Sequence, residues 1–346
     1  MLTKKQVEEI KDLLESSSNP LFLFDNDPDG LCSFLLLRKY CGKGKGFPVR
    51  SFPDLNESYF RKIRELEADS VFILDKPVVS PDFFKRAEEV NLPVVWIDHH
   101  ETEREKIPPF VHYYNPVFNR RKSSEPVTAL CRQINPDKNL LWLAVAGCVS
   151  DHFSPDFYKD FSSRYPELSV DSENAFDIFY KSPVGRIARI FSFALKDSIT
   201  NVVGMIKFLT NANSPYDVLE ESAENRQMHL RFAQIESKYR KLADRAAKVA
   251  EGSGKFVFFQ YGGDLSISAD ISNELSYRFP GKNIIVIYLS GAKANISARG
   301  EGIREKILRA MEGLQGATGG GHEDAAGGQI RSEDIKVFEG RLEYPG

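Results

Sequence analysis

The first half of the chain alternates short apolar runs with stretches of helical periodicity. The apolar runs are Leu21–Phe24, Val71–Leu74 and Val94–Ile97, and each is bounded by turn-forming residues. Helical patterns lie between these runs, and residues 138–149 have the pattern of one buried helix. Short apolar runs interleaved with helices are typical of buried parallel strands in βαβ units. The pattern therefore predicts an α/β domain built on a parallel sheet.

The pattern changes after residue 152, from strand–helix alternation to continuous helix. Residues 153–215 are helix-prone and contain several aromatic residues, which predicts a helical elaboration of the first domain. Residues 216–251 contain neither glycine nor proline, their charges alternate and their apolar positions are sparse. A polar stretch of this kind is typical of a connecting helix between domains.

A second α/β pattern follows a glycine-containing break at residues 252–254. Its strand patterns are Phe256–Gln260, Ile284–Leu289 and Ala294–Ala298, and two helical patterns alternate with them. The predicted fold is thus a parallel-sheet α/β domain joined by a long helix to a smaller α/β domain. The predicted domain limits are residues 1–215, with the helical elaboration at about 153–215, then the connecting helix at 216–252 and the second domain at 253–346.

Composition narrows the class of protein. With 42% hydrophobic and 27% charged residues, the chain of 346 residues has the profile of a soluble globular protein. Its 46 basic and 49 acidic residues give a net charge of −3, so there is no general basic character for coating duplex DNA. No apolar run approaches the ~20 residues of a membrane span, and we expect no membrane partner. Four scattered cysteines without a CxxC pair disfavour a disulfide framework and fit a cytoplasmic location.

Acidic residues follow all three apolar runs of the first domain. Asp25, Asp75 and Asp98 come directly after the predicted strands. Ligands of open parallel sheets bind at the carboxyl ends of the strands, so we expect these carboxylates to converge at one edge. Like charges brought together are costly unless cations neutralise them. The sequence therefore predicts a cation site at this edge.

The neighbours of these carboxylates add further candidate ligands. The first run continues as Asp25-Asn26-Asp27-Pro28-Asp29-Gly30, the third as Asp98-His99-His100, and Asp151 follows the apolar helix. Carboxylate oxygens with imidazole nitrogens suit Mn²⁺ or Mg²⁺, with Zn²⁺ as a further alternative. Taken singly, an Asp after a strand is ordinarily a helix cap or turn former, and a histidine pair lies at the surface. The coincidence at three strand ends favours a dinuclear metal site.

A glycine-rich element near the C-terminus is a second candidate site. It has the sequence Gly319-Gly320-Gly321-His322, and Ser297 and Arg299 alternate along the preceding strand, so both point to one face. The bare N–H groups of a glycine loop can approach a phosphate or base closely, and an arginine can grip a phosphate with two hydrogen bonds. The alternative is a glycine-rich turn between strands.

Together these motifs resemble those of DHH-superfamily phosphoesterases with a C-terminal DHHA1 domain. That superfamily includes RecJ-type exonucleases, oligoribonucleases and cyclic-dinucleotide phosphodiesterases. The matching motifs are Asp25–Gly30, Asp75, Asp98–His100 and Gly147–Asp151, followed by Ser297-x-Arg299 and Gly319–His322 as the DHHA1 signature. They extend over nearly the whole chain.

The resemblance implies two divalent ions, Mn²⁺ or alternatively Mg²⁺, bridged by Asp75. The implied metal ligands are Asp25 and Asp27 for the first ion, Asp29, His99 and Asp151 for the second, and Asp75 for both. His100 is expected to face the scissile phosphate, while Asp98 orients a histidine. The implied substrate-binding residues are Ser297, Arg299, Gly319, Gly320, Gly321 and His322.

The function that the resemblance implies is hydrolysis of single-stranded DNA or RNA, or of short oligonucleotides, from a chain end. Arg120, Arg121 and Lys122 are candidate contacts to the nucleic-acid backbone, or else an ordinary solvated turn. One alternative is a phosphodiesterase of cyclic dinucleotides or small phosphate esters. An alternative of another class is a non-catalytic Cdc45-like replication scaffold, which the full set of metal-ligand types disfavours. Replication or repair proteins are the expected protein partners.

Overall fold

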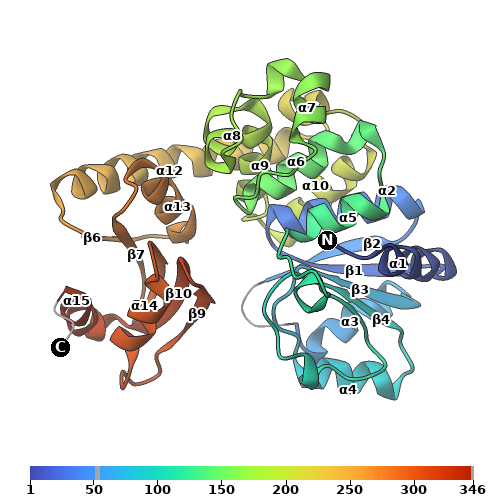
Figure 1. Cartoon of the computed structure of the whole chain (residues 1–346), viewed down its shortest axis with the longest axis horizontal. Coiled ribbons are helices and arrows are strands. Elements are labelled where there is room, and N and C mark those ends of the chain that lie inside the picture. The colour runs from blue at the N-terminus through green and yellow to red at the C-terminus, as the bar shows by residue number, and fades with distance from the viewer. Residues whose placement is uncertain (51–54, 344–346) are drawn as a thin grey trace. The chain divides into compact units, whose positions relative to one another are not determined.

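The computed structural model describes residues 1–50 and 55–343. They divide into two compact units, Met1–Phe232 and Ala233–Gly346. Helix α12 (Arg226–Gly252) contains the boundary between them (Figure 1). Among the helices of the described residues, none combines the length and apolar character that a membrane crossing requires.

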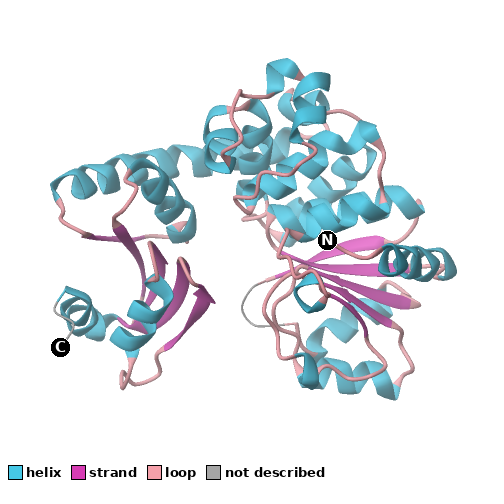
Figure 2. Ribbon diagram, viewed as in Figure 1, coloured by secondary structure: helices cyan, strands magenta, loops and turns pink. Residues whose placement is uncertain are grey.

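A five-stranded parallel sheet forms the centre of the first unit (Figure 2). Its strand order is β2–β1–β3–β4–β5, and every pairing is parallel. The three predicted strands are confirmed, because each carries a buried apolar run. The sequence missed the two edge strands, which are short or contain Gly and Pro and so lack such a run. The strands are β1 (Pro20–Asp25), β2 (Lys45–Val49), β3 (Ser70–Leu74), β4 (Val94–Ile97) and β5 (His112–Tyr114).

Helices cover both faces of this sheet (Figure 1). On one face, α2 (Pro28–Cys41) packs against α5 (Val127–Ile134) and α6 (Leu141–Ser150). Residues 28–37 of α2 are all buried, so this part of the helix is enclosed around its whole circumference rather than on one stripe. On the other face, α3 (Phe60–Glu65) and α4 (Pro81–Glu89) close a cluster around Phe83 and Trp96.

Helices occupy most of the segment at about 153–215 for which the sequence predicts a helical elaboration. Three of its helices, α7, α8 and α9, contact α6, and the residues of α9 are largely buried. The helices are α7 (Tyr158–Arg164), α8 (Ala175–Lys181), α9 (Pro183–Ala194), α10 (Ile199–Asn211) and α11 (Pro215–Leu219), and α1 (Lys4–Ser16) contacts α5. Single 3₁₀ turns stand at Glu57–Tyr59, Arg104–Lys106, Pro116–Phe118, Lys138–Leu140, Pro166–Leu168 and Ser332–Asp334.

The connecting helix begins later than the sequence predicted. Residues 216–219 belong to α11, and α12 starts only at Arg226. Asn225 explains the interruption, because its Nδ2 donates to the carbonyl oxygens of Asp217 and Glu220, each at 2.8 Å. Because the side-chain amide donates to two carbonyl oxygens at a helix end, the chain can turn there and neither acceptor is left without a hydrogen bond.

The second unit is built on a mixed sheet of order β6–β7–β8–β10–β9, in which only the β6–β7 pairing is parallel. One face packs on α14 and α15 through a core that includes Ile285, Ile296 and Phe338. Helix α13 contacts β7 and β8. The elements are β6 (Phe256–Gly262), α13 (Ser268–Arg278), β7 (Asn283–Ser290), β8 (Lys293–Arg299), α14 (Ile303–Met311), β9 (Thr318–His322), β10 (Ala325–Arg331) and α15 (Ile335–Glu343).

The glycine-rich element is a strand rather than the predicted loop or turn. Its three glycines lie in β9, which pairs with β10 at the edge of the sheet. Gly321 has φ +128°, and an added Cβ there would lie 2.4 Å from the carbonyl oxygen of Ala325. Glycine has low strand propensity, so neither composition nor periodicity signalled a strand here.

Candidate metal centre and substrate face

The loops after β1, β3 and β4 bring their carboxylates to one edge of the sheet. The parallel hydrogen-bond pattern extends one residue past each strand, since Asp75 N donates to Ile97 O and Asp98 N to Tyr114 O, both at 3.0 Å. Asp75 is 3% exposed and Asp98 is fully buried. Two carboxylates are thus fixed by main-chain bonds inside the protein, where they need compensation.

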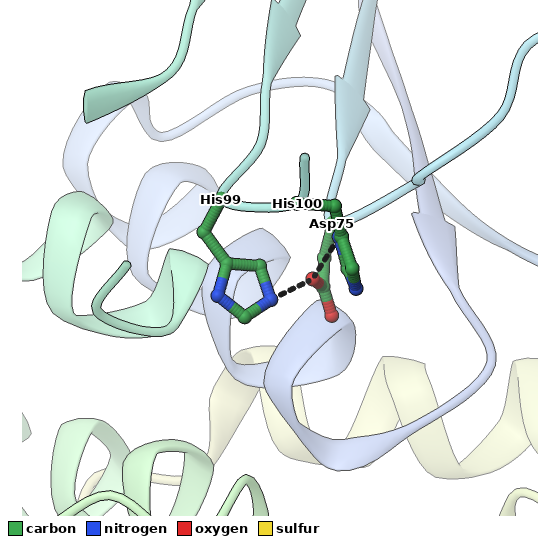
Figure 3. A group of neighbouring side chains, drawn as sticks. All are labelled: Asp75, His99 and His100. Carbon is green, nitrogen blue, oxygen red and sulfur yellow. Dashed lines mark ion pairs between the residues drawn. The ribbon is translucent and has the colours of Figure 1, made fainter. Parts of the chain in front are cut away.

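Asp75 follows β3, the middle strand of the sheet, and its carboxylate lies beside the rings of His99 and His100 (Figure 3). Its Oδ1 lies 3.3 Å from His99 Nε2 and 4.0 Å from His100 Nδ1. Among the described residues, no donor makes a hydrogen bond to this buried oxygen. Asp75 also has φ +59°, a left-handed conformation that Asp tolerates better than most residues but that still stores strain. A strained backbone that presents an unsatisfied acceptor indicates a functional constraint.

His99 is oriented to offer a lone pair to this centre. Its Nδ1 lies 3.3 Å from the carbonyl oxygen of Ser124, which can only accept, so Nδ1 is the donor. In the neutral ring Nε2 is then unprotonated, and it lies 3.3 Å from Asp75 Oδ1 and 3.7 Å from Asp151 Oδ2. A lone pair that faces two carboxylates is repulsive unless a proton or a metal ion lies between them. The donor set therefore fits a metal ion.

Two groups of ligand atoms meet at His99. In each group, one ligand atom per residue lies within 4.8 Å of the others: Asp75, His99 and His100 in the first, Asp29, His99 and Asp151 in the second. Asp29 is held in place at the start of α5, where its two carboxylate oxygens accept from the backbone N–H groups of residues 127 and 128 at 2.8 Å. The sequence-predicted ligands Asp29, Asp75, His99 and Asp151 therefore lie together.

The crowding of carboxylates is reflected in their pKa values. Burial raises the pKa of Asp75 well above its usual range, and the charges of Asp29, Asp27 and Asp151 add to the effect. Burial and the charge of Asp151 raise the pKa of Asp29 to about 6. Burial, with the charges of Asp25 and Asp29, likewise raises the pKa of Asp27. A divalent cation reverses this electrostatic cost.

His100 is held by a buried network. Its Nδ1 lies 2.8 Å from Asp98 Oδ1, and Tyr113 Oη donates to Asp98 Oδ2 at 3.3 Å. Asn115 Nδ2 donates to Tyr113 Oη and to the carbonyl oxygen of His100, both at 2.8 Å. Burial opposes the charged form of His100, but the hydrogen bond and charge of Asp98, together with the charges of Asp151 and Asp27, raise the His100 pKa. Tyr113 and Asn115 were missed, because the short β5 region gave no signal.

Asp27 and Asp25 make contacts of a different kind. Asp27 caps α2, with Oδ1 accepting from Gly30 N at 2.9 Å. Asp25 Oδ1 instead accepts from the Nζ of Lys76 at 2.9 Å. Neither carboxylate belongs to the two ligand groups around His99. Gly30 allows the close approach of α2 to β1, since an added Cβ would lie 2.4 Å from Asp25 O.

In the second unit, four of the six predicted substrate residues share one face of the sheet, namely Ser297, Arg299, Gly320 and His322. Gly319 and Gly321 alternate with them and face the other side, where a Cβ added to Gly319 would lie 3.0 Å from Met311 Sδ. Ser297 pairs with Gly327 and Gly327 with Gly320, while Arg299 pairs with residue 325 and residue 325 with His322. Paired and alternate residues of antiparallel strands point to the same side. A Cβ added to Gly320 would meet no described heavy atom within 4 Å. The face thus presents bare backbone beside an arginine and a histidine.

Helix α13 holds two of these side chains. Asn273 Oδ1 accepts from Arg299 Nε at 2.5 Å, and the Arg299 Nη1 donates to the carbonyl oxygen of residue 298 at 2.7 Å. The Ser297 and Ser268 hydroxyls lie 2.9 Å apart. Asn273 was missed by the sequence, because an Asn within a helical pattern is an ordinary polar residue.

Residues 21–149 match the family model described as DHH family, N-terminal domain. The match runs from β1 into α6 and includes the sheet edge with Asp75 and His99. This part of the chain is therefore similar to DHH-family N-terminal domains. A comparison with curated proteins finds no match.

Solved structures show the architecture of the whole chain. RecJ from Thermus thermophilus in complex with Mn²⁺ matches with a TM-score of 0.73 and 16% identity, over 99% of this chain and 55% of that one. This chain thus spans about half the length of that RecJ. Exonuclease RecJ bound to manganese matches with a TM-score of 0.66 and 15% identity, over 99% and 94%. Cdc45 from Entamoeba histolytica matches with a TM-score of 0.56 and 10% identity, over 98% of each chain. The chain has the fold of these proteins, as the sequence motifs predicted.

Proposed function

We propose that this chain is a metal-dependent phosphodiesterase that hydrolyses single-stranded nucleic acid or short oligonucleotides from an end. The observation that carries the proposal is the buried Asp75 Oδ1, which has no hydrogen-bond donor among the described residues and faces the lone pair of His99. A phosphodiester cleavage site needs clustered cation ligands of this kind. The DHH-family match and the RecJ fold support the same class of reaction.

The proposed metal ligands are the residues that converge at the sheet edge. Asp75, His99, Asp29 and Asp151 provide oxygen and imidazole ligands that suit Mn²⁺, with Mg²⁺ as the alternative. Asp27, whose pKa is raised in part by the neighbouring carboxylates, completes a set large enough for two ions. Bound divalent ions supply an activated water and neutralise charge on the phosphate.

His100 is the proposed acid at the scissile phosphate. Asp98 orients the ring and favours its charged form, so His100 can donate a hydrogen bond to a phosphate or leaving-group oxygen. Because Asp98 is fully buried and also bound by Tyr113, the ring is held in position before the substrate binds.

Substrate binding is proposed for the bare face of the second unit and for a basic segment of the first. Arg299 and His322 flank the glycine backbone, where a terminal nucleotide or phosphate can lie close to main-chain N–H groups. Residues 120–122 are exposed, basic, and close in sequence to Ser124, which contacts His99. Their charge suits the backbone of a single strand.

The test is a hydrolysis panel with Mn²⁺. Single-stranded oligonucleotides of graded length, labelled at the 5′ or the 3′ end, are compared with cyclic dinucleotides and a small phosphate diester. We expect a ladder from one end of the single strands. Turnover of cyclic dinucleotides or small esters alone would show that the proposed substrate class is wrong. No turnover of any of these substrates would refute the proposed phosphodiesterase activity.

A non-catalytic scaffold is the second candidate, because the Cdc45 fold matches over 98% of both chains. The two candidates differ in metal binding. A scaffold that has no use for the centre should not bind Mn²⁺ tightly, whereas the phosphodiesterase must. Calorimetric titration with Mn²⁺, with Asp75→Asn as the matched control, separates them.

A further inference from the structure

Lys76 follows Asp75 directly and is buried, with 1% of its surface exposed. Lysine is almost never fully buried unless its ammonium group is paired. Here Nζ donates to Asp25 Oδ1 at 2.9 Å and to the carbonyl oxygen of Arg50 at 3.4 Å. Asp25 is therefore the counter-charge of Lys76 within the protein.

The pair ties together strand ends that carry the candidate metal centre. Asp25 is the last residue of β1 and Lys76 lies two residues past the end of β3, its neighbour in the sheet. The carbonyl oxygen of Lys76 accepts from Trp96 Nε1 on β4 at 3.0 Å. Asp25 Oδ1 also accepts from Asn26 N at 3.0 Å, so this oxygen has two donors. Asp75 directly precedes Lys76 in the chain, so it lies next to these hydrogen-bonded groups.

The same contact bears on the role of Asp25 toward metal. A divalent ion on the Asp25 carboxylate would lie a few Å from the Lys76 ammonium, and two cations at that distance repel each other. Asp25 belongs to neither of the two ligand groups around His99. Asp25, at the end of β1, already has a counter-charge in Lys76.

We propose that the Lys76 ammonium takes the place of a metal ion beside Asp25. Asp25 accordingly is not a metal ligand, although the sequence motifs implied that it is. The Lys76–Asp25 pair instead balances its own charge at the end of β1. This inference rests on the proposed metal centre and narrows its ligand set.

The matched experiment replaces both charges together. Asp25→Asn alone leaves an uncompensated cation that repels metal, so the informative variant is Asp25→Asn with Lys76→Gln, which keeps a hydrogen-bonding pair without charge. We expect this double variant to bind the same number of Mn²⁺ ions per chain as the wild type, with an affinity within about tenfold. Asp75→Asn, the ligand control, should lose more than about tenfold.

Single variants give a signature that a merely structural role would not produce. Lys76→Gln leaves Asp25 charged and without its ammonium, so we expect Mn²⁺ to bind more tightly or in a higher ratio than in the wild type. Lys76→Arg, which retains the charge, should restore wild-type binding. If the double variant loses one Mn²⁺ per chain, or if Lys76→Gln weakens binding as Asp75→Asn does, the inference is overturned.

Two further measurements keep the inference testable in every case. In EDTA, each single variant should melt below the wild type and the double variant should recover, because breaking one side of a buried pair costs more than removing both. In Mn²⁺-soaked crystals of the wild type, no anomalous peak should lie at coordination distance, about 2 Å, from the Asp25 oxygens. A wild type that binds no Mn²⁺ would refute the proposed function, while additive melting shifts or a metal on Asp25 would refute this inference.

Discussion

The Asp75→Asn variant tests two effects of the carboxylate cluster separately. These effects are charge repulsion in the metal-free protein and metal binding in the presence of Mn²⁺. The amide has nearly the same size as the carboxylate but removes the charge at the position where burial and four neighbouring carboxylates act together. In the metal-free protein the charge is a burden, so its removal should leave the melting temperature unchanged or raise it. In the presence of Mn²⁺ the charge is a ligand, so its removal should abolish the stabilisation that the metal gives.

The size of the metal effect follows from linkage and from the size of the unit. A ligand at 100 times its Kd that binds only the folded state contributes about 2.7 kcal/mol. For a unit of the size of Met1–Phe232, each kcal/mol shifts Tm by roughly 2–4 °C. We therefore expect saturating Mn²⁺ to raise the wild-type Tm by roughly 5–10 °C relative to EDTA.

The assay is a thermal melt of the wild type, Asp75→Asn and Asp171→Asn, each in EDTA and in Mn²⁺. Asp171 is an exposed carboxylate of the same unit and serves as the matched control. The control should behave like the wild type, while Asp75→Asn should lose the Mn²⁺ shift and hydrolyse nothing. A variant that melts several degrees lower in EDTA yet keeps the full Mn²⁺ shift would show that Asp75 is a structural residue.

Three further predictions concern protons and substrate. The folded-state pKa of Asp29 is about 6, above its value in an unfolded chain, so metal-free stability should rise as the pH falls through about 6, and Mn²⁺ affinity should fall over the same range; melts and titrations across pH check both signs. Asp98→Asn removes the charge that raises the His100 pKa, so the loss of activity at high pH should move to lower pH in the pH–rate profile. Arg299→Ala should weaken oligonucleotide binding by roughly ten- to a hundred-fold, the equivalent of about 1.5–3 kcal/mol, and His322→Ala should weaken it in the same direction. Both variants should still hydrolyse bis-p-nitrophenyl phosphate. If both variants cleave oligonucleotides as the wild type does, the face that carries Arg299 and His322 does not bind the substrate.

The sequence predicted those parts of the fold in which buried positions form a recognisable run of apolar residues. Strands β1, β3 and β4 are apolar because helices cover both faces, and the ends of these apolar runs predict Asp25, Asp75 and Asp98 at one edge of the sheet. The edge strands could not be predicted in this way. A strand such as β9, with three glycines in five residues, is defined by its pairing with β10 and not by its own side chains.

The candidate site also contains residues that the sequence predicted and residues that it did not. The acidic and histidine ligand types are visible in the sequence because their chemistry is unusual in that spacing. The partners that orient them are not, since Tyr113, Asn115 and Asn273 are ordinary residues until the fold brings them to Asp98 and Arg299. Lys76 is the strongest case, because a lysine after a strand indicates a solvated side chain unless a carboxylate on the next strand is known to reach it.

The most direct test of the central claim is the time course of cleavage of an end-labelled single-stranded oligonucleotide. The wild type with Mn²⁺ should shorten the strand progressively from one end, EDTA should stop the reaction, and renewed Mn²⁺ should restart it. Asp75→Asn should leave the strand intact under all three conditions. A wild type that binds Mn²⁺ and single strands but never shortens them, or a variant at Asp75 that cleaves like the wild type, would contradict the account.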